Sequence, residues 1–125
     1  MRTKEKRQTA YRAGIWAETL AVWYLRLKGY RILARRLRSP VGELDIVARR
    51  GRVVAFIEVK SRPDAVTAAA SLTPQQQRRI EKAALAYMAH LPKGADLDMR
   101  FDVFLVAGSA RLQHMADAWR PAGQV

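Results

Sequence analysis

The stretch GELDIVA (residues 42–48), followed by RRGR (49–52) and VVAFIEVK (53–60), decides the fold of this chain. Both outer segments are rich in apolar and β-branched residues, and the short basic segment between them contains a glycine. This pattern is typical of a β-hairpin. A two-residue loop at Gly51 and Arg52 suits a type II′ turn, because that turn favours glycine at its first central position.

This loop places Asp45 opposite Glu58 and Glu43 opposite Lys60, with all four side chains on one face of the hairpin. The other face is expected to be apolar, with Leu44, Ile46, Ile57 and Val59. Two opposed carboxylates repel each other, and a raised pKa, a salt bridge to Lys60 or a bound cation would relieve the repulsion. Mg²⁺ favours a site with one or two carboxylates. The alternative is a solvated face with cross-strand charge pairs.

Helices and strands are predicted on both sides of this hairpin. From periodicity and turn residues we expect a helix over 8–28, a strand over 30–38, a loop over 62–72, a helix from the capping box at Thr73 to before Pro92, and strands over 100–107 and 112–115. The chain is therefore expected to form a single α/β domain over residues 1–125, with a basic N-terminal arm at 1–9 and a loose tail at 120–125.

Composition limits the class of protein. The 125 residues carry 23 basic and 11 acidic side chains, for a net charge of +12, and half of the residues are apolar. The absence of cysteine excludes disulfides and cysteine-ligated zinc. Apolar runs such as 53–57 are too short to span a membrane, and Arg12 and Glu18 interrupt any signal-peptide segment behind the basic N-terminus. We therefore expect a cytoplasmic protein that does not enter membranes.

Positive charge is concentrated in the first half of the chain and indicates a polyanion partner. Five arginines near the hairpin are the candidate nucleic-acid-binding residues: Arg31, Arg35, Arg36, Arg38 and Arg62. Solubility or attraction to an anionic membrane would explain the same charge. Nucleic acid is favoured, because no segment combines a basic face with an apolar face that the core does not need.

Several motifs together resemble a known family. They are GxxAE at 14–18, GExD at 42–45, FIEVKSR at 56–62 and RFD at 100–102. The spacing from Asp45 to Glu58-x-Lys60 resembles the PD-(D/E)XK nuclease signature, with its Pro-Asp half relaxed to Gly-Glu-x-Asp. More narrowly, residues 13–115 resemble the uncharacterised bacterial YraN-type family, which is similar to archaeal Holliday-junction resolvases. The resemblance implies a restriction-endonuclease-like core, with a central mixed β-sheet flanked by helices.

The resemblance also implies roles for particular residues. Asp45 and Glu58 would hold Mg²⁺ or Mn²⁺ together with the Val59 carbonyl, and Lys60 would be the catalytic lysine. Glu18 would be a further catalytic carboxylate that reaches the site from the first helix. A helical wheel agrees, because it places Glu18 within the apolar stripe, where an unpaired carboxylate is costly. A salt bridge to a nearby arginine is the alternative for Glu18.

Glu43 and Gln76 are accessory candidates. Gln76 stands where family members often carry lysine, and Leu37 stands where they usually show asparagine. A glutamine on this helix approaches the metal site in many nucleases of the superfamily. Gln76 has an equally good explanation as the third helical residue of the capping box.

The predicted function is that of a divalent-metal-dependent endonuclease that hydrolyses DNA phosphodiesters, with branched or junction DNA as a candidate substrate. The alternative is a catalytically silent nucleic-acid-binding module on the same fold. Trp16 and Trp23 either pack against the N-terminal arm or form a homodimer interface, which the dimeric resolvase-like relatives suggest by analogy. Neither Asp102 nor His114 can be assigned a role from the sequence.

Overall fold

The protein is described by a computed structural model over residues 4–92, 96–108 and 111–122. Its helices and strands follow in the order α1 (Lys4–Leu27), β1 (Arg31–Ser39), β2 (Gly42–Arg50), β3 (Val53–Arg62), α2 (Ala65–Ala70), α3 (Pro74–Met88), β4 (Asp98–Ala107) and β5 (Arg111–Trp119). The strands form one sheet in the order β1-β2-β3-β4-β5. Since β3 and β4 are parallel and the other neighbours antiparallel, the sheet is mixed.

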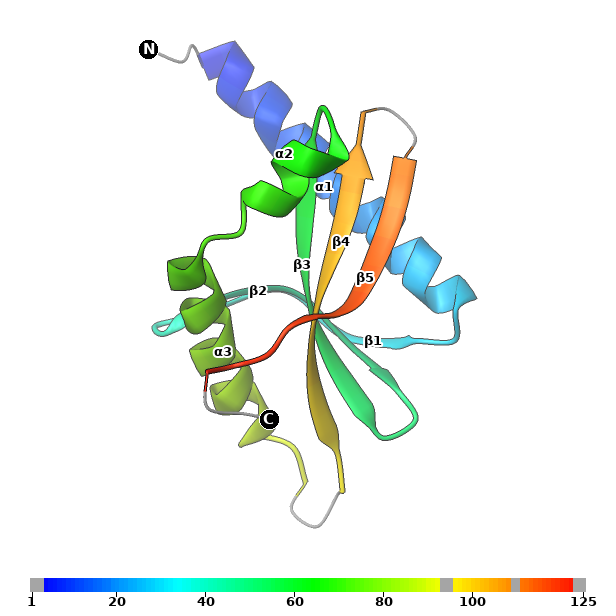
Figure 1. Cartoon of the computed structure of the whole chain (residues 1–125), viewed down its shortest axis with the longest axis vertical. Helices are drawn as coiled ribbons and strands as arrows, with labels where there is room; N and C mark the ends of the chain where they lie inside the picture. The colour runs from blue at the N-terminus through cyan, green and yellow to red at the C-terminus, as the bar shows by residue number, and fades with distance from the viewer. Residues whose placement is uncertain (1–3, 93–95, 109–110, 123–125) are drawn as a thin grey trace.

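Helices cover both faces of this sheet (Figure 1). The helix α1 packs on one face through small and aliphatic residues that recur at helical spacing: Ala17, Ala21, Val22 and Leu25. The helix α3 packs on the other face through Ile80, Ala83 and Ala84, and α2 contributes Ala68 beside it. The predicted α/β architecture, a mixed sheet flanked by helices in a restriction-endonuclease-like core, is confirmed.

The β2–β3 hairpin has the predicted register. Ile46 pairs with Ile57 and Arg50 pairs with Val53, which leaves a two-residue loop. Gly51 in that loop has φ +61°. Glycine adopts this left-handed conformation without the steric penalty that a Cβ would bring.

Beyond the pair of Ile46 and Ile57, β2 and β3 separate. The ladder between them ends there, while β2 continues beside β1 and β3 continues beside β4. In Figure 1 the β1–β2 pair turns toward α3, whereas β3 runs on toward α2. The sheet therefore contains a fork between β2 and β3.

The fork corrects part of the predicted hairpin. Neither the pairing of Glu43 with Lys60 nor that of Asp45 with Glu58 belongs to the ladder. Leu44 packs in the cluster beneath α3, whereas Ile46 and Ile57 pack beneath α1. The single apolar face expected for all these residues was therefore wrong for Leu44, which lies beyond the last β2–β3 pair.

Other boundaries also differ from the prediction. The helix α1 begins at Lys4, so residues 4–9 of the expected arm are helical. A short helix, α2, lies in the segment expected to be a loop, and the Asp64 side chain caps it by accepting the Thr67 backbone N–H. Residues 1–3 of the arm and 123–125 of the tail lie outside the described part of the chain. No described helix is long and apolar enough to cross a membrane.

Asp102 on β4 is fully buried at the centre of a polar cluster. Its carboxylate accepts hydrogen bonds from Arg100 Nε at 2.8 Å and from the Asp117 backbone N–H at 3.0 Å, and it lies 2.8 Å from His114 Nε2. Burial would raise the pKa of Asp102, but these hydrogen bonds together lower it below its usual value. Lys28 Nζ lies 2.9 Å from His114 Nδ1, so the cluster joins the end of α1 to β4 and β5.

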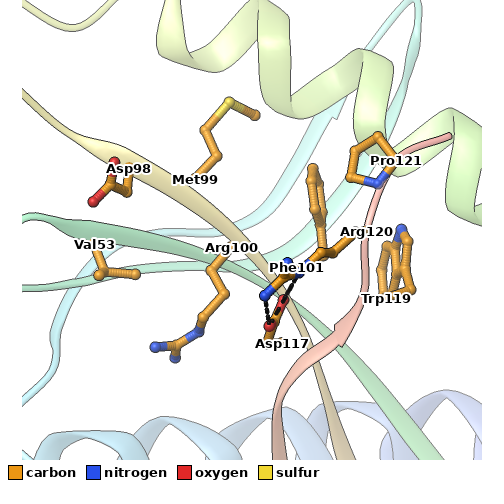
Figure 2. A pocket seen from close by; sticks show the side chains of 9 residues that line it. All are labelled: Val53, Asp98, Met99, Arg100, Phe101, Asp117, Trp119, Arg120 and Pro121. Carbon is orange, nitrogen blue, oxygen red and sulfur yellow. Dashed lines mark hydrogen bonds and ion pairs between the residues drawn. The ribbon is translucent and has the colours of Figure 1, made fainter. Parts of the chain in front are cut away.

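A bulge in β5 brings Asp117 to this cluster. The β4–β5 register shifts between Phe101 and Val103, and Asp117 has φ +55°. A cavity of about 330 Å³ opens beside the bulge (Figure 2). Figure 2 shows the Arg120 guanidinium turned toward the Asp117 carboxylate, 2.9 Å away, and Trp119 beside Phe101. The charges of Asp117 and Arg120 therefore neutralise each other at the edge of this cavity.

Candidate functional site

The predicted site residues converge on a cavity of about 770 Å³ at the fork between β2 and β3. Its lining comes from α1, β1, β2 and β3: Gly14, Ala17, Glu18, Arg36, Glu43, Asp45, Glu58, Val59, Ser61 and Arg62. Most of these side chains are charged, although the surrounding strands are apolar. The cavity lies where the β2–β3 ladder has ended, so backbone polar groups that a continuous ladder would pair need other partners there.

Where the β2–β3 ladder is interrupted, the Asp45 side chain accepts a backbone hydrogen bond from β3. Its Oδ2 accepts the Val59 backbone N–H at 2.9 Å. In a strand, the N–H and C=O groups of one residue point to the same side. The Val59 carbonyl therefore faces the same side of β3 as Asp45.

Asp45 and Glu58 are close enough for their carboxyl groups to share a hydrogen bond. Burial raises the pKa of both groups. For Glu58, burial and the neighbouring Asp45 charge raise the pKa to about 8, although Lys60 opposes the rise. The pair therefore retains a proton near neutral pH, unless a cation replaces it.

Lys60 is buried, and its Nζ lies 3.4 Å from Glu58 Oε1. The sequence predicted Glu43 as the residue opposite Lys60. Glu43 instead lines the cavity with half of its side chain exposed, and its Oε2 lies 3.9 Å from Arg38 Nε. The ion pair of Lys60 with Glu58 places the ammonium group beside the buried acidic pair.

Glu18 reaches the cavity from α1 and is only 7 % exposed. Its Oε2 lies 3.2 Å from Arg36 Nε, whereas its Oε1 is buried with no hydrogen-bond partner. Burial raises the pKa of Glu18, and the Arg36 guanidinium opposes part of that rise. The two interpretations of Glu18, as a site carboxylate and as an arginine partner, are thus compatible, because each concerns a different oxygen.

Arg36 reaches Glu18 from an unusual backbone conformation. It has φ +50°, and the β1–β2 register shifts a few residues earlier, between Ile32 and Ala34. A non-glycine residue in the left-handed region costs roughly 1–2 kcal/mol. The sequence predicted a nearby arginine as the alternative partner of Glu18 but did not identify Arg36, because nothing in the sequence marks where a strand of alternating apolar and basic residues will bulge.

The donor set fits a hard divalent cation. Within the described part of the chain, no group of three or more His, Cys, Asp or Glu side chains is arranged to hold a metal. The carboxylates of Asp45 and Glu58 and the Val59 carbonyl are all oxygen donors. Mg²⁺ prefers a set of this kind, with one or two carboxylates and with water in the remaining positions.

The other predicted site residues are not equally close to the cavity. Arg62 lines it, and Arg35 contacts Thr19 on α1 at 3.5 Å. Arg31 pairs with Arg49 at the far end of β1 and does not line the cavity. Gln76 forms the capping box of α3 with Thr73, as one of its two interpretations predicted, and it does not line the cavity either.

These features define an α/β protein with a restriction-endonuclease-like core and a buried acidic site at a strand fork. The chain belongs to the UPF0102 family: the family model described as "Uncharacterised protein family UPF0102" matches residues 17–106. This result confirms the predicted membership of the YraN-type family.

The chain is similar to UPF0102 proteins of several bacteria over most of its length. It is 56% identical over 112 residues to a UPF0102 protein of Parvibaculum lavamentivorans, and the aligned region covers 90% of this chain and 84% of the relative. It is 52% identical over 117 residues to UPF0102 protein amb4503 of Paramagnetospirillum magneticum, covering 90% and 91%. It is 50% identical over 114 residues to a UPF0102 protein of Rhodopseudomonas palustris, covering 91% and 88%.

Proposed function

We propose that this protein is a divalent-metal-dependent endonuclease that hydrolyses DNA phosphodiesters, with branched or junction DNA as its candidate substrate. The observation that carries the proposal is the hydrogen-bonded Asp45–Glu58 pair, which lines one cavity together with Glu18. The buried Lys60 lies beside this cavity and is paired with Glu58. The net charge of +12 supports a polyanionic substrate.

Asp45 and Glu58, with the Val59 carbonyl, would hold Mg²⁺ or Mn²⁺. Such an ion, when bound, lowers the pKa of water and neutralises charge on a phosphoryl group. Lys60 would position the attacking water and stabilise the charge that develops at phosphorus. Arg36 would favour the ionised form of Glu18 and fix the orientation of its side chain.

Loss of Lys60 or Glu58 is expected to remove most of the cleavage activity. With Mn²⁺ and a panel of duplex, single-stranded and four-way-junction DNA, we expect Lys60→Ala and Glu58→Ala to cut at least about 100-fold more slowly than the wild type. Glu81→Gln on α3, outside the cavity, is the control and should cut normally. The proposal is wrong if the wild type cuts none of the substrates, or if both alanine variants cut as fast as the wild type.

A second candidate function is nucleic-acid binding without chemistry on the same fold. Two observations favour it: no third metal-ligating side chain joins Asp45 and Glu58 among the described residues, and Gln76 is engaged in a helix cap. Calorimetric titration with Mn²⁺ separates the two functions. If the protein is a nuclease, Mn²⁺ binding to the wild type should give a heat change that the Asp45→Asn variant lacks. If it is a binding module, neither the wild type nor Asp45→Asn should give a heat of Mn²⁺ binding.

Both functions predict salt-dependent DNA binding centred on the cavity. Arg62→Gln should weaken DNA binding and reduce the slope of log K against log salt by about 1, because one phosphate contact is lost. Arg31→Gln removes the same charge at the far end of β1, away from the cavity, and should change the slope less. Fluorescence anisotropy across a salt series measures both slopes. Equal effects of the two substitutions would show that the DNA does not follow the cavity.

A further inference from the structure

Contrary to the expectation that no segment has an apolar face beyond what the core needs, the outer face of α1 exposes an apolar stripe that nothing in the described chain covers. Trp16 is 61% exposed, Trp23 59% and Leu27 88%, and the partly buried Leu20 lies at the edge of the stripe. Successive residues turn by about 100° around a helix, so the three exposed side chains lie within roughly 40° of one another. We call these three residues the α1 stripe. Packing against the N-terminal arm, one of the two interpretations of the tryptophans, is excluded for residues 4–9 of the arm, because they belong to the same helix.

The surroundings of the α1 stripe are basic. Arg26 is exposed, and its guanidinium lies over the Trp23 ring, 5.3 Å from the centroid. Lys28 is exposed beyond Leu27, and Arg35 of β1 contacts Thr19 on the adjoining side of α1. Over its length α1 contains five basic residues and two acidic ones. One of the acids, Glu18, faces the opposite side of the helix, toward the cavity.

We propose that the α1 stripe is the docking site for an acidic amphipathic helix of another protein. A narrow apolar stripe, with spacings of seven and four residues, is the seam that helix pairs use. Cations beside such a seam favour Glu or Asp beside the apolar residues of the partner. The exposed area is small, so the complex is expected to be transient.

Three other occupants fit less well. A second copy of this chain would present the same exposed Arg26 and Lys28, and among the residues of α1 whose side chains are described no exposed carboxylate would compensate them. A membrane-surface helix needs a much wider apolar face than this stripe. DNA bound in the cavity would lie on the other side of α1, since Glu18 is roughly 140–180° around the helix from the stripe residues.

The test uses the full-length protein and a synthetic helical probe. The probe is a peptide of about three heptads with Leu at the a and d positions, Glu at the flanking positions and no aromatic residue. Tryptophan fluorescence should shift to shorter wavelength and saturate as the peptide is added, because two of the three tryptophans lie in the stripe. A matched peptide with Lys in place of Glu should produce no shift.

Variants locate the binding surface. Leu27→Ser should weaken binding of the acidic peptide about tenfold or more, since it replaces an apolar side chain that the complex would bury with a polar one. Leu85→Ser on α3, where the leucine is 62% exposed, is the matched control and should bind normally. Arg26→Glu should weaken binding of the acidic peptide and strengthen binding of the basic peptide.

Several results would overturn this inference. If both peptides bind equally, or neither binds, the basic residues beside the stripe do not select an acidic helix. A dimer in sedimentation that Leu27→Ser abolishes would assign the stripe to a second copy. A fluorescence shift with anionic vesicles or single-stranded DNA that Leu27→Ser abolishes would assign it to lipid or to nucleic acid. None of these results depends on the proposed nuclease function, because the substitutions lie on the side of α1 away from Glu18 and leave the cavity unchanged.

Discussion

In metal-free buffer near pH 8, the Glu58→Gln variant is expected to unfold at a higher temperature than the wild-type protein. Burial and the neighbouring Asp45 charge raise the pKa of Glu58 to about 8, so ionised Glu58 destabilises the fold. Glutamine keeps the shape and can donate a hydrogen bond to Asp45. We expect a gain on the order of 3 kcal/mol at pH 8, which calorimetric unfolding can measure.

The pH dependence of this effect has a definite sign. Below the ordinary pKa of glutamate, near 4.5, Glu58 is protonated in both the folded and the unfolded protein and contributes nothing. Between about 4.5 and 8, the unfolded chain releases this proton and the folded protein keeps it. The free energy of unfolding of the wild type should therefore fall as pH rises through this window. In Glu58→Gln it should depend less on pH.

Glu43→Gln is the control for this prediction, because Glu43 lines the same cavity with an exposed side chain. It should change the melting temperature and its pH dependence little. Addition of Mn²⁺ should stabilise the wild type, in proportion to binding, and should stabilise Glu58→Gln much less. A metal-free Glu58→Gln variant that is less stable than the wild type at pH 8 would show that ionised Glu58 supports the fold.

The opposite effect is expected for Asp102. Asp102→Asn leaves Arg100 without its carboxylate partner inside the cluster that also contains His114. Breaking a buried ion pair by removing one partner typically costs 3–5 kcal/mol. We expect Asp102→Asn to lose about 3 kcal/mol of the free energy of unfolding and roughly 10 °C of melting temperature.

The pH dependence here runs the other way. Because the pKa of Asp102 is lowered in the folded protein, its contribution is complete above the ordinary pKa of aspartate and is lost as pH falls below it. The stability difference between the wild type and Asp102→Asn should therefore shrink in acid. Asp98→Asn, on an exposed residue of the same strand, is the control and should be nearly neutral. A neutral Asp102→Asn would mean that the cluster does not stabilise the fold.

Local sequence patterns were sufficient to predict the central hairpin, the start of α3 and the buried position of Glu18. The apolar runs on either side of Gly51 determined the hairpin and its register, since a two-residue turn fixes which residues face each other. The same holds for the cap of α3, because the sequence from Thr73 to Gln76 contains both partners of the capping box. The buried position of Glu18 followed from helical periodicity.

Only the tertiary structure decided how the site is assembled. The fork between β2 and β3 directs Asp45 to the Val59 N–H and separates Glu43 from Lys60. It arises because β2 follows β1 and β3 follows β4. Such a competition between neighbouring strands has no local signature.

The same limit applies to residues whose roles depend on distant partners. Arg36 on β1 meets Glu18 on α1, and Asp102 meets His114 across two strands. By itself, the sequence determined the elements, the hairpin register and the types of residue available to a site, because these depend on neighbours along the chain. The pairing of charges in the buried regions depended on packing between segments far apart in the sequence, and only the folded structure fixed it.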